Sequence, residues 1–262
     1  MDTHRSLDIA TEGAVRWIWL NRPDIRNAFN PQMITELTEA FSAIDSNTDL
    51  RAIVLAGRGK VFCAGADLNW MREMAQYTQE QNLADALDLA DMLAAIDNCP
   101  VPVVARVQKA AFGGALGLVA CCDSVIATTN AKFAFSEVRL GISPATIAPY
   151  VFNKIGSSGA RDLFLSGEVF TAAQALRHAL VHTVVAESEL DTAIEAKLSN
   201  LLKAGPVAAR RTKQLIKVLS SKVSPDLRQQ TAELIAELRT SKEGQEGLGA
   251  FLAKRDPNWL TG

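Results

Sequence analysis

The fold of this 262-residue chain is decided by the stretch RAIVLAGRGKVFCAGAD, residues 51–67. Its apolar first half predicts a fully buried strand, and its second half is a turn of small residues that leads into the next helix. The stretch VPVVARVQKAAFGGALG, residues 101–117, repeats the arrangement. Strands that alternate with helices form parallel sheets, so we predict an α/β fold with binding sites at the carboxyl ends of strands.

The flanking sequence continues this alternation. SLDIATEGAVRWIWLNRP, residues 6–23, predicts a hairpin that turns at Glu12 and Gly13, and residues 124–129 predict another strand. Helices are expected at residues 31–46 and 83–99. The second of these carries one apolar stripe, formed by Leu83, Leu87, Ala90, Leu93 and Ile96.

Strand signals end near residue 186, and helices are expected at residues 190–202, 207–219 and 227–238. We therefore divide the chain into a core, residues 1–202, and a C-terminal helical region, residues 203–262. The net formal charge of −2 separates into −7 for the core and +5 for the C-terminal region. The near-neutral total argues against a nucleic-acid partner. The basic region is either a set of solvated helix faces or a contact for anionic phosphate or an acidic neighbour.

The composition predicts a cytoplasmic globular protein with no membrane partner. Hydrophobic residues make up 48% and charged residues 21% of the chain. No apolar segment near the N-terminus has the form of a secretory signal, and the apolar run at residues 110–122 is too short to span a bilayer. Its cysteines lack CxxC spacing and are expected to be reduced, buried thiols: Cys63, Cys99, Cys121 and Cys122.

Two turns of small residues, at residues 62–67 and 112–117, each precede a helix whose first N–H groups are free. Each turn alone is more often a packing device, but two such turns facing each other would form an oxyanion hole. Glu137 lies in the apolar segment KFAFSEVRLGISP, where burial would raise its pKa and suit it to acid or base catalysis. A surface carboxylate paired with Arg139 is an equally weighted alternative.

Other catalytic motifs are missing from the sequence. His178 and His182 have the spacing of a helical metal pair but lack a third ligand, so we favour helix C-terminal histidines and predict no metal. The sequence contains no GxSxG, GxGxxG or GxxxxGK[ST] motif. Covalent catalysis and phosphoryl transfer are therefore disfavoured.

These features resemble the crotonase, or enoyl-CoA hydratase/isomerase, superfamily over essentially the whole chain. FCAGAD at residues 62–67 followed by Gly113-Gly114 is the specific part of the resemblance. The supporting motifs are Asn21-Arg22-Pro23, Asn27-Ala28, residues 100–103, Cys122-Asp123, Ser136-Glu137 with Gly141 and Pro144, and residues 251–255. The resemblance implies a spiral of ββα units with a C-terminal helical region, assembled as a homotrimer or a dimer of trimers. It also implies acyl-CoA thioester substrates, with coenzyme A as part of the substrate and no separate cofactor.

The family's site residues map onto this sequence position by position. The N–H groups of Ala66 and Gly114 would bind the thioester oxygen. The residues that the resemblance places near coenzyme A are Arg26, Ala28, Ala64, Asp67 and Lys254. Typical hydratases carry two glutamates, and here Glu137 occupies the second position while Gly117 stands at the first. Glu137 must then act alone, shuttle the proton itself, or use a substrate group.

Gly117 and the neighbouring blocks are most similar to bacterial methylglutaconyl-CoA hydratases of leucine and acyclic terpene catabolism. Such substrates carry a distal carboxylate, so Arg72 and Arg139 are candidate substrate-binding cations, with ordinary ion pairs as the equally weighted alternative. We expect the acyl pocket to be shaped by side chains such as Trp70, Met71, Met74 and Phe152.

Hydration of an α,β-unsaturated acyl-CoA is the leading hypothesis, with Glu137 as the general acid and base. A Δ3,Δ2-enoyl-CoA isomerase, which needs one base, is the alternative. A third hypothesis is a catalytically silent CoA binder or an RNA-binding homologue. RNA binding is disfavoured because Arg210, Arg211 and Lys213 form only a small basic cluster and aromatic residues make up only 6% of the chain.

Overall fold

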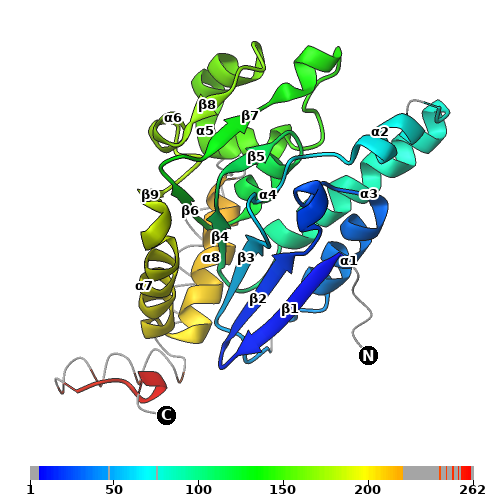
Figure 1. Ribbon diagram of the computed structural model, residues 1–262. Helices are drawn as coiled ribbons and strands as arrows, with labels where there is room; N and C mark the ends of the chain where they lie inside the picture. Colours follow the sequence, from blue (N-terminus) through cyan, green and yellow to red (C-terminus); the bar gives the residue numbers. More distant parts are fainter. Residues whose placement is uncertain are drawn as a thin grey trace.

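The computed structural model describes residues 6–46, 48–74, 76–220, 242, 246, 250, 253 and 255–260. A six-stranded sheet with the order β1-β2-β3-β4-β6-β9 forms its centre, and a three-stranded sheet, β5-β7-β8, lies beside it (Figure 1). The large sheet consists of β1 (Leu7–Glu12), β2 (Val15–Leu20), β3 (Ala52–Gly57), β4 (Val103–Val107), β6 (Ser124–Thr128) and β9 (Thr183–Val185). The small sheet consists of β5 (Ala110–Phe112), β7 (Lys132–Ala134) and β8 (Phe170–Thr171).

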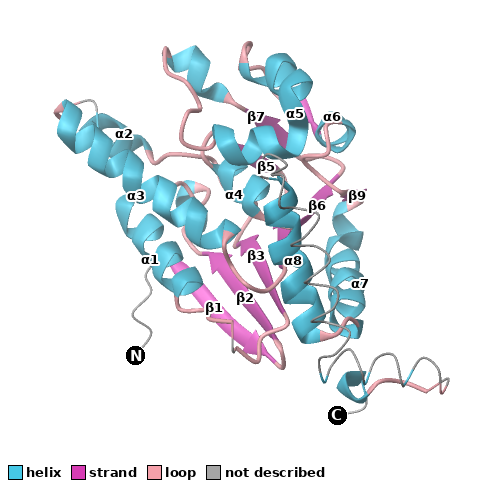
Figure 2. Ribbon diagram, turned by 180° about the vertical axis from the view of Figure 1, so that it is seen from behind, coloured by secondary structure: helices cyan, strands magenta, loops and turns pink. Residues whose placement is uncertain are grey.

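Helices cover both faces of the large sheet, with α1 and α3 on one face and α7 on the other (Figures 1 and 2). The helices are α1 (Pro31–Ser42), α2 (Leu68–Met74), α3 (Gln79–Asp97), α4 (Ala115–Cys121), α5 (Ala148–Phe164), α6 (Ala172–Arg177), α7 (Leu190–Lys203) and α8 (Pro206–Ser220). Short 3₁₀ turns are η1 (Pro23–Ile25), η2 (Ser136–Leu140), η3 (Glu187–Glu189) and η4 (Asn258–Leu260). This arrangement confirms the predicted α/β class.

Strand β3 is buried over its whole length, as the apolar run predicts. Ile53 and Leu55 pack into the core under α1 and α3, while Val54 and Ala56 pack against α7. Side chains of a strand point alternately to its two faces, so a strand covered on both sides must be apolar throughout. The hairpin of β1 and β2 is the antiparallel part of the large sheet, and its other strand pairs are parallel.

The apolar stripe predicted along residues 83–99 is correct only in its C-terminal half. Leu93 and Ile96 are fully buried, but Leu83 and Leu87 are 60% and 53% exposed. The N-terminal part of α3 extends with α2 away from the large sheet (Figure 1), so the central core does not reach it. Helical spacing identifies one face of a helix but does not tell how far the neighbouring core extends.

The first part of the C-terminal region is fixed to the core by its basic side chains. Lys213 donates to the Asp123 carboxylate at 2.6 Å and to the Val101 carbonyl oxygen at 3.0 Å. Arg210 donates to the Ser46 carbonyl oxygen at 2.7 Å. Two members of the basic cluster thus bind the protein itself, which further disfavours an RNA surface. The helix predicted at residues 227–238 and the Lys254 position lie outside the described residues.

All four cysteines are free and buried, as predicted. Burial raises the pKa of the Cys63 and Cys122 thiols to about 12, so they are not nucleophilic thiolates near neutral pH. Among the described helices, none combines the length and the apolar character needed to cross a membrane.

Asn27 fastens the loop that follows β2 to the loop that follows β3. Its side chain is fully buried, accepts from the Arg22 N–H at 2.8 Å, and donates to the Val61 and Phe62 carbonyl oxygens at 2.8 and 3.1 Å. Its backbone has a φ of 54°, a conformation that asparagine adopts more readily than most residues. This single side chain therefore fixes the start of the FCAGAD loop.

Asn27→Ala is expected to lower the free energy of unfolding by about 2–4 kcal/mol, because buried carbonyl groups and one N–H lose their partner. Urea denaturation measures the change. Asn21→Ala, at an exposed side chain in the same loop, serves as the control and should be nearly neutral. An equal effect at the two positions would contradict the role given to Asn27.

Candidate active site

The two turns of small residues lie side by side, held by backbone pairing. Cys63 N donates to the Ala110 carbonyl oxygen at 3.2 Å, and Phe112 N donates to the Cys63 carbonyl oxygen at 3.2 Å. On the other side of the first turn, Phe29 N donates to the Gly65 carbonyl oxygen at 2.7 Å. Gly65 is required here, since its φ is 93° and a Cβ atom would lie 2.8 Å from the Phe112 carbonyl oxygen.

This pairing brings Ala66 and Gly114 into the wall of one cavity of about 270 Å³, the acyl cavity, together with Glu137. Within the described part of the chain, neither the Ala66 N–H nor the Gly114 N–H has a hydrogen-bond acceptor. The two turns thus line a common cavity, and their role as an oxyanion hole stays a prediction. Two free backbone donors in one cavity can bind an oxygen that gains negative charge.

Glu137 lies in η2, beside the second turn. A Cβ atom at Gly113 would lie 3.5 Å from Glu137 Oε1, so the carboxyl group lies against the backbone that precedes Gly114. Glu137 Oε2 is buried and has no hydrogen-bond partner among the described residues. Burial raises the pKa of Glu137 above its usual value. A carboxyl group in this state can exchange a proton with a bound substrate.

The alternative interpretation, a surface ion pair of Glu137 with Arg139, is wrong. Arg139 is exposed, and its Nε donates to the Ser166 carbonyl oxygen at 3.1 Å. Arg72 is also exposed and donates to Asn69 Oδ1 at 2.6 Å. Neither arginine belongs to the lining of the acyl cavity, so the structure does not bring these two predicted cations to the site.

Gly117, the position of the missing glutamate, lies in the core. A Cβ atom there would lie 2.6 Å from Ile147 Cγ2 and 3.0 Å from Leu93 Cδ2. Ile147 lines the acyl cavity and separates Gly117 from it. The structure therefore does not place Gly117 in contact with substrate, and the space that a second carboxylate would need is filled by apolar side chains.

The acyl cavity contains two of the four side chains expected to shape it, Trp70 and Met74. Met71 does not line it, and Phe152 is 48% exposed. Sequence reasoning missed much of its wall. The missed residues are Phe29, Asn82, Asp85, Ala86, Leu89, Ile142, Ser143, Ala145, Thr146 and Ile147. No sequence signal identified them, because Phe29 lies in the segment before α1 and the others come from α3 and the loop before α5, which only the fold brings to the two turns.

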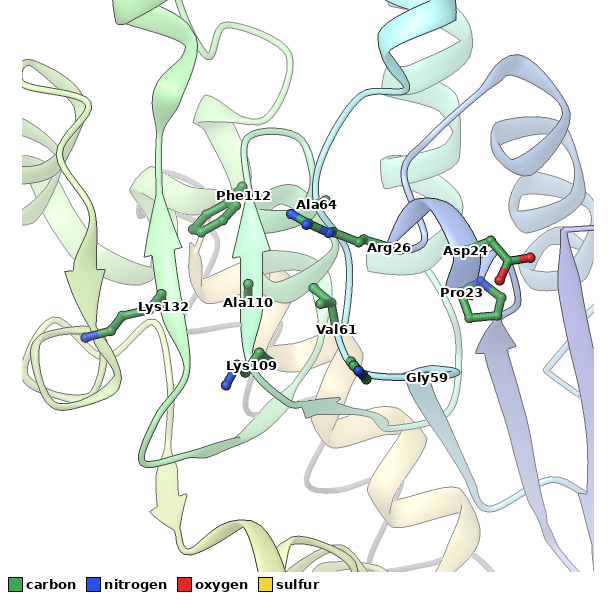
Figure 3. Close-up of a pocket in the computed structure, with 11 residues that line it drawn as sticks. Pro23, Asp24, Arg26, Gly59, Val61, Ala64, Lys109, Ala110, Phe112 and Lys132 are labelled. Carbon is green, nitrogen blue, oxygen red and sulfur yellow. The ribbon is translucent and has the colours of Figure 1, made fainter.

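A second cavity, of about 740 Å³, is lined by other residues of the same two turns, and we call it the basic cavity. Ala64 and Phe112 line it, whereas Ala66 and Gly114, two residues further along, line the acyl cavity. Figure 3 shows the Arg26 side chain extending toward Ala64. The basic cavity is also lined by Lys60, Lys109, Lys132 and Asp24. The sequence analysis did not identify its three lysines, because isolated lysines in loops and at the start of a strand carry no distinctive spacing.

Ala28 and Asp67, two other residues expected near coenzyme A, bind groups of the protein itself. Ala28 is buried, and its carbonyl oxygen accepts from Arg22 Nη1 at 2.7 Å. Asp67 forms an ion pair with Arg22 at 2.9 Å and accepts from the Asn69 N–H at 2.8 Å. Burial alone would raise the pKa of Asp67, but these hydrogen bonds and the Arg22 charge outweigh it and lower the pKa. The structure thus gives Asp67 a role in fixing the loop.

His178 and His182 lie in different surroundings. His178 follows the last residue of α6, which confirms its place at a helix C-terminus, and its Nε2 lies 3.1 Å from Asp162 Oδ2. His182 lies in the loop before β9, and its Nδ1 accepts from the Val125 N–H at 2.9 Å, so its placement on a helix was wrong. The described residues contain no group of three or more metal-ligating side chains.

Comparison with known proteins places this fold and site in one family. Residues 10–261 match the family model described as enoyl-CoA hydratase/isomerase. The chain therefore belongs to the enoyl-CoA hydratase/isomerase, or crotonase, family.

Individual relatives match over nearly the full length. "Probable enoyl-CoA hydratase echA8" of Mycobacterium bovis is 33% identical over 260 residues, which cover 98% of both chains. A Legionella pneumophila structure assigned as an enoyl CoA hydratase/isomerase (crotonase) is 43% identical, with a TM-score of 0.89 over 97% of this chain and 98% of its own. The structure of Pseudomonas aeruginosa AtuE is 35% identical, with a TM-score of 0.94 over 97% of this chain and 99% of its own.

Gly117→Ala is expected to lower the free energy of unfolding by about 1–3 kcal/mol, because the added methyl group overpacks the contact with Ile147. The gain in helix propensity from alanine offsets only part of this cost. The matched test is a double-mutant cycle with Ile147→Ala, measured by urea denaturation. In the Ile147→Ala background the alanine at position 117 should be neutral or stabilising, and an undiminished cost there would contradict the packing argument.

Proposed function

We propose that this protein hydrates α,β-unsaturated acyl-CoA thioesters. The observation that carries the proposal concerns one cavity, which Glu137, Ala66 and Gly114 line together. Among the described residues, neither the buried Glu137 Oε2 nor the N–H groups of Ala66 and Gly114 have a hydrogen-bond partner. Full-length relatives that bear the name enoyl-CoA hydratase support it.

The two N–H groups stabilise the transition state. Attack of water on the β-carbon moves electrons through the conjugated system onto the thioester oxygen. The N–H groups of Ala66 and Gly114 donate to this oxygen, and their hydrogen bonds strengthen as its charge grows. Their positions are fixed beforehand by the backbone pairing of the two turns, so little reorganisation is needed during the reaction.

Glu137 handles both protons of the addition. Its carboxylate accepts a proton from water as the new C–O bond forms at the β-carbon, and it then delivers a proton to the α-carbon of the enolate. The hydroxyl group and the hydrogen together balance the addition of one water molecule. One carboxylate with a raised pKa suits both steps, because it is a stronger base than an exposed glutamate and a usable acid once protonated.

The basic cavity fits the nucleotide part of coenzyme A. Arg26, Lys60, Lys109 and Lys132 oppose a single carboxylate, Asp24, in a space large enough for a nucleotide. The thioester would then cross between the two turns into the acyl cavity. Ala28, Ala64 and Asp67 would shape the loop around coenzyme A, and the approach of Lys254 to a CoA phosphate stays a prediction. The reaction requires no further cofactor.

A Δ3,Δ2-enoyl-CoA isomerase is the second candidate, favoured by the apolar packing around Gly117, which leaves one glutamate at the site. An isomerase would create the conjugated enoyl absorbance from a 3-enoyl thioester, whereas a hydratase would remove it from a 2-enoyl thioester. Incubation with the two thioesters separates the activities.

Three finer expectations stay predictions. A methylglutaconyl thioester is the substrate that the sequence resemblance favours, although neither Arg72 nor Arg139 lines the acyl cavity. Assembly as a homotrimer or a dimer of trimers is expected from the family, and a cytoplasmic location from the composition.

Glu137→Gln is expected to lower kcat/KM about 10²- to 10⁴-fold, because glutamine cannot accept a proton from water. In the unmodified enzyme, kcat/KM for hydration should fall as the pH drops through the Glu137 pKa, since the protonated carboxyl group is no longer a base. The raised pKa places this decline above the usual glutamate value of about 4.3. Loss of enoyl absorbance measures both effects, and near-normal activity of Glu137→Gln would refute the assignment.

Replacing Lys60, Lys109 and Lys132 together by alanine is expected to raise KM for a CoA thioester by roughly tenfold, since each exposed ion pair contributes about 0.2–1 kcal/mol. The same acyl group on N-acetylcysteamine lacks the nucleotide phosphates and serves as the control. Its KM should not change. An equal rise for both thioesters would show that the lysines do not bind the nucleotide.

A further inference from the structure

Asp85 is a second carboxylate in the wall of the acyl cavity, and it has no part in the mechanism above. It lies on α3, in the wall that includes Asn82, Ala86 and Leu89. Trp70 Nε1 donates to Asp85 Oδ1 at 3.0 Å. Because Trp70 is only 5% exposed, its indole fixes the position of the carboxylate. Asp85 is thus a fixed polar feature of the site.

Nothing positive balances this carboxylate in the part of the chain that the structure describes. The acyl cavity has no lysine, arginine or histidine in its lining, and no ion pair involves Asp85. The second oxygen, Oδ2, has no hydrogen-bond donor there. The ionisable side chains of the lining are therefore Asp85 and Glu137, both acidic.

Burial, together with the nearby charge of Asp88, raises the pKa of Asp85, although the Trp70 hydrogen bond opposes the shift. The site therefore already disfavours the negative charge of Asp85. A second anion brought into the same small cavity would lose its hydration and gain no cation.

We propose that Asp85 determines acyl specificity by rejecting acyl chains that end in a carboxylate, and so restricts the enzyme to 2-enoyl thioesters with uncharged chains. This inference rests on the proposed hydratase function and deepens it. It runs against the glutaconyl-type substrate that the sequence resemblance favours. Rejection by an unpaired like charge is a common way for a site to discriminate between ligands of similar shape.

The test compares two thioesters of equal chain length, 2-pentenoyl-CoA and glutaconyl-CoA, which differ by a terminal carboxylate. For the unmodified enzyme, kcat/KM should be higher for 2-pentenoyl-CoA by at least about tenfold, the effect of roughly 1.4 kcal/mol of like-charge repulsion. Asp85→Asn keeps the acceptor for Trp70 and removes the charge. It should reduce this preference at least about tenfold by raising kcat/KM for glutaconyl-CoA.

Two further variants make the test specific to this carboxylate. Asp85→Glu restores the charge and should restore the preference for 2-pentenoyl-CoA. Asp88→Asn removes an exposed charge three residues further along α3. As expected for a surface charge, it should change the preference for 2-pentenoyl-CoA by no more than about threefold.

The proposal is overturned if the unmodified enzyme hydrates glutaconyl-CoA as well as 2-pentenoyl-CoA, or if Asp85→Asn leaves the preference intact. It is also overturned if Asp85→Asn lowers kcat/KM equally for both thioesters, since Asp85 would then serve the reaction rather than the choice of acyl chain. These results differ from failure of the proposed function, in which the unmodified enzyme hydrates neither thioester.

Discussion

The site depends on the backbone pairing between the FCAGAD turn and β5. The Cys63 N–H and carbonyl oxygen bind the Ala110 carbonyl oxygen and the Phe112 N–H, so two segments far apart in sequence run side by side. This pairing places Ala66 and Gly114 in the lining of one cavity, and their N–H groups have no acceptor among the described residues. Side chains on flexible loops would have to be ordered by the substrate, whereas a backbone ladder orders its donors when the protein folds.

The packing around Gly117 then determines how many acid and base groups the site can use. Ile147 and Leu93 occupy the space next to this residue, so the absence of a first glutamate is built into the core and does not leave a vacant pocket for water. In the proposed mechanism Glu137 consequently serves both proton steps. The burial that raises its pKa is useful for this reason, since it brings the basic and acidic forms closer in energy near neutral pH.

Much of the fold and part of the site could be predicted from the sequence. The buried strand at residues 51–57, the hairpin and the two turns follow from local patterns, and the apolar setting of Glu137 indicates its raised pKa. The exposure of Leu83 and Leu87 could not be predicted, because it depends on where α3 leaves the core. Asp85, Ile147 and the three lysines were missed because their roles arise only when distant segments meet. Arg72 and Arg139 lie near the motifs in sequence, but nearness in sequence does not fix the direction of an exposed side chain.

The opposite charges of the two cavities give a physical reason for the orientation of the substrate. One turn contributes Ala64 to the basic cavity and Ala66 to the acyl cavity, and the other contributes Phe112 and Gly114 in the same way. Four basic side chains and the single carboxylate of Asp24 line the basic cavity, whereas the two carboxyl groups of Asp85 and Glu137 line the acyl cavity. A molecule with an anionic nucleotide at one end and an uncharged chain at the other fits in one direction only. The reversed molecule would bring its phosphates to Glu137 and Asp85, where no described cation could balance them. In the proposed reaction, charge would thus orient the whole molecule, while the two N–H groups would position its reacting carbonyl.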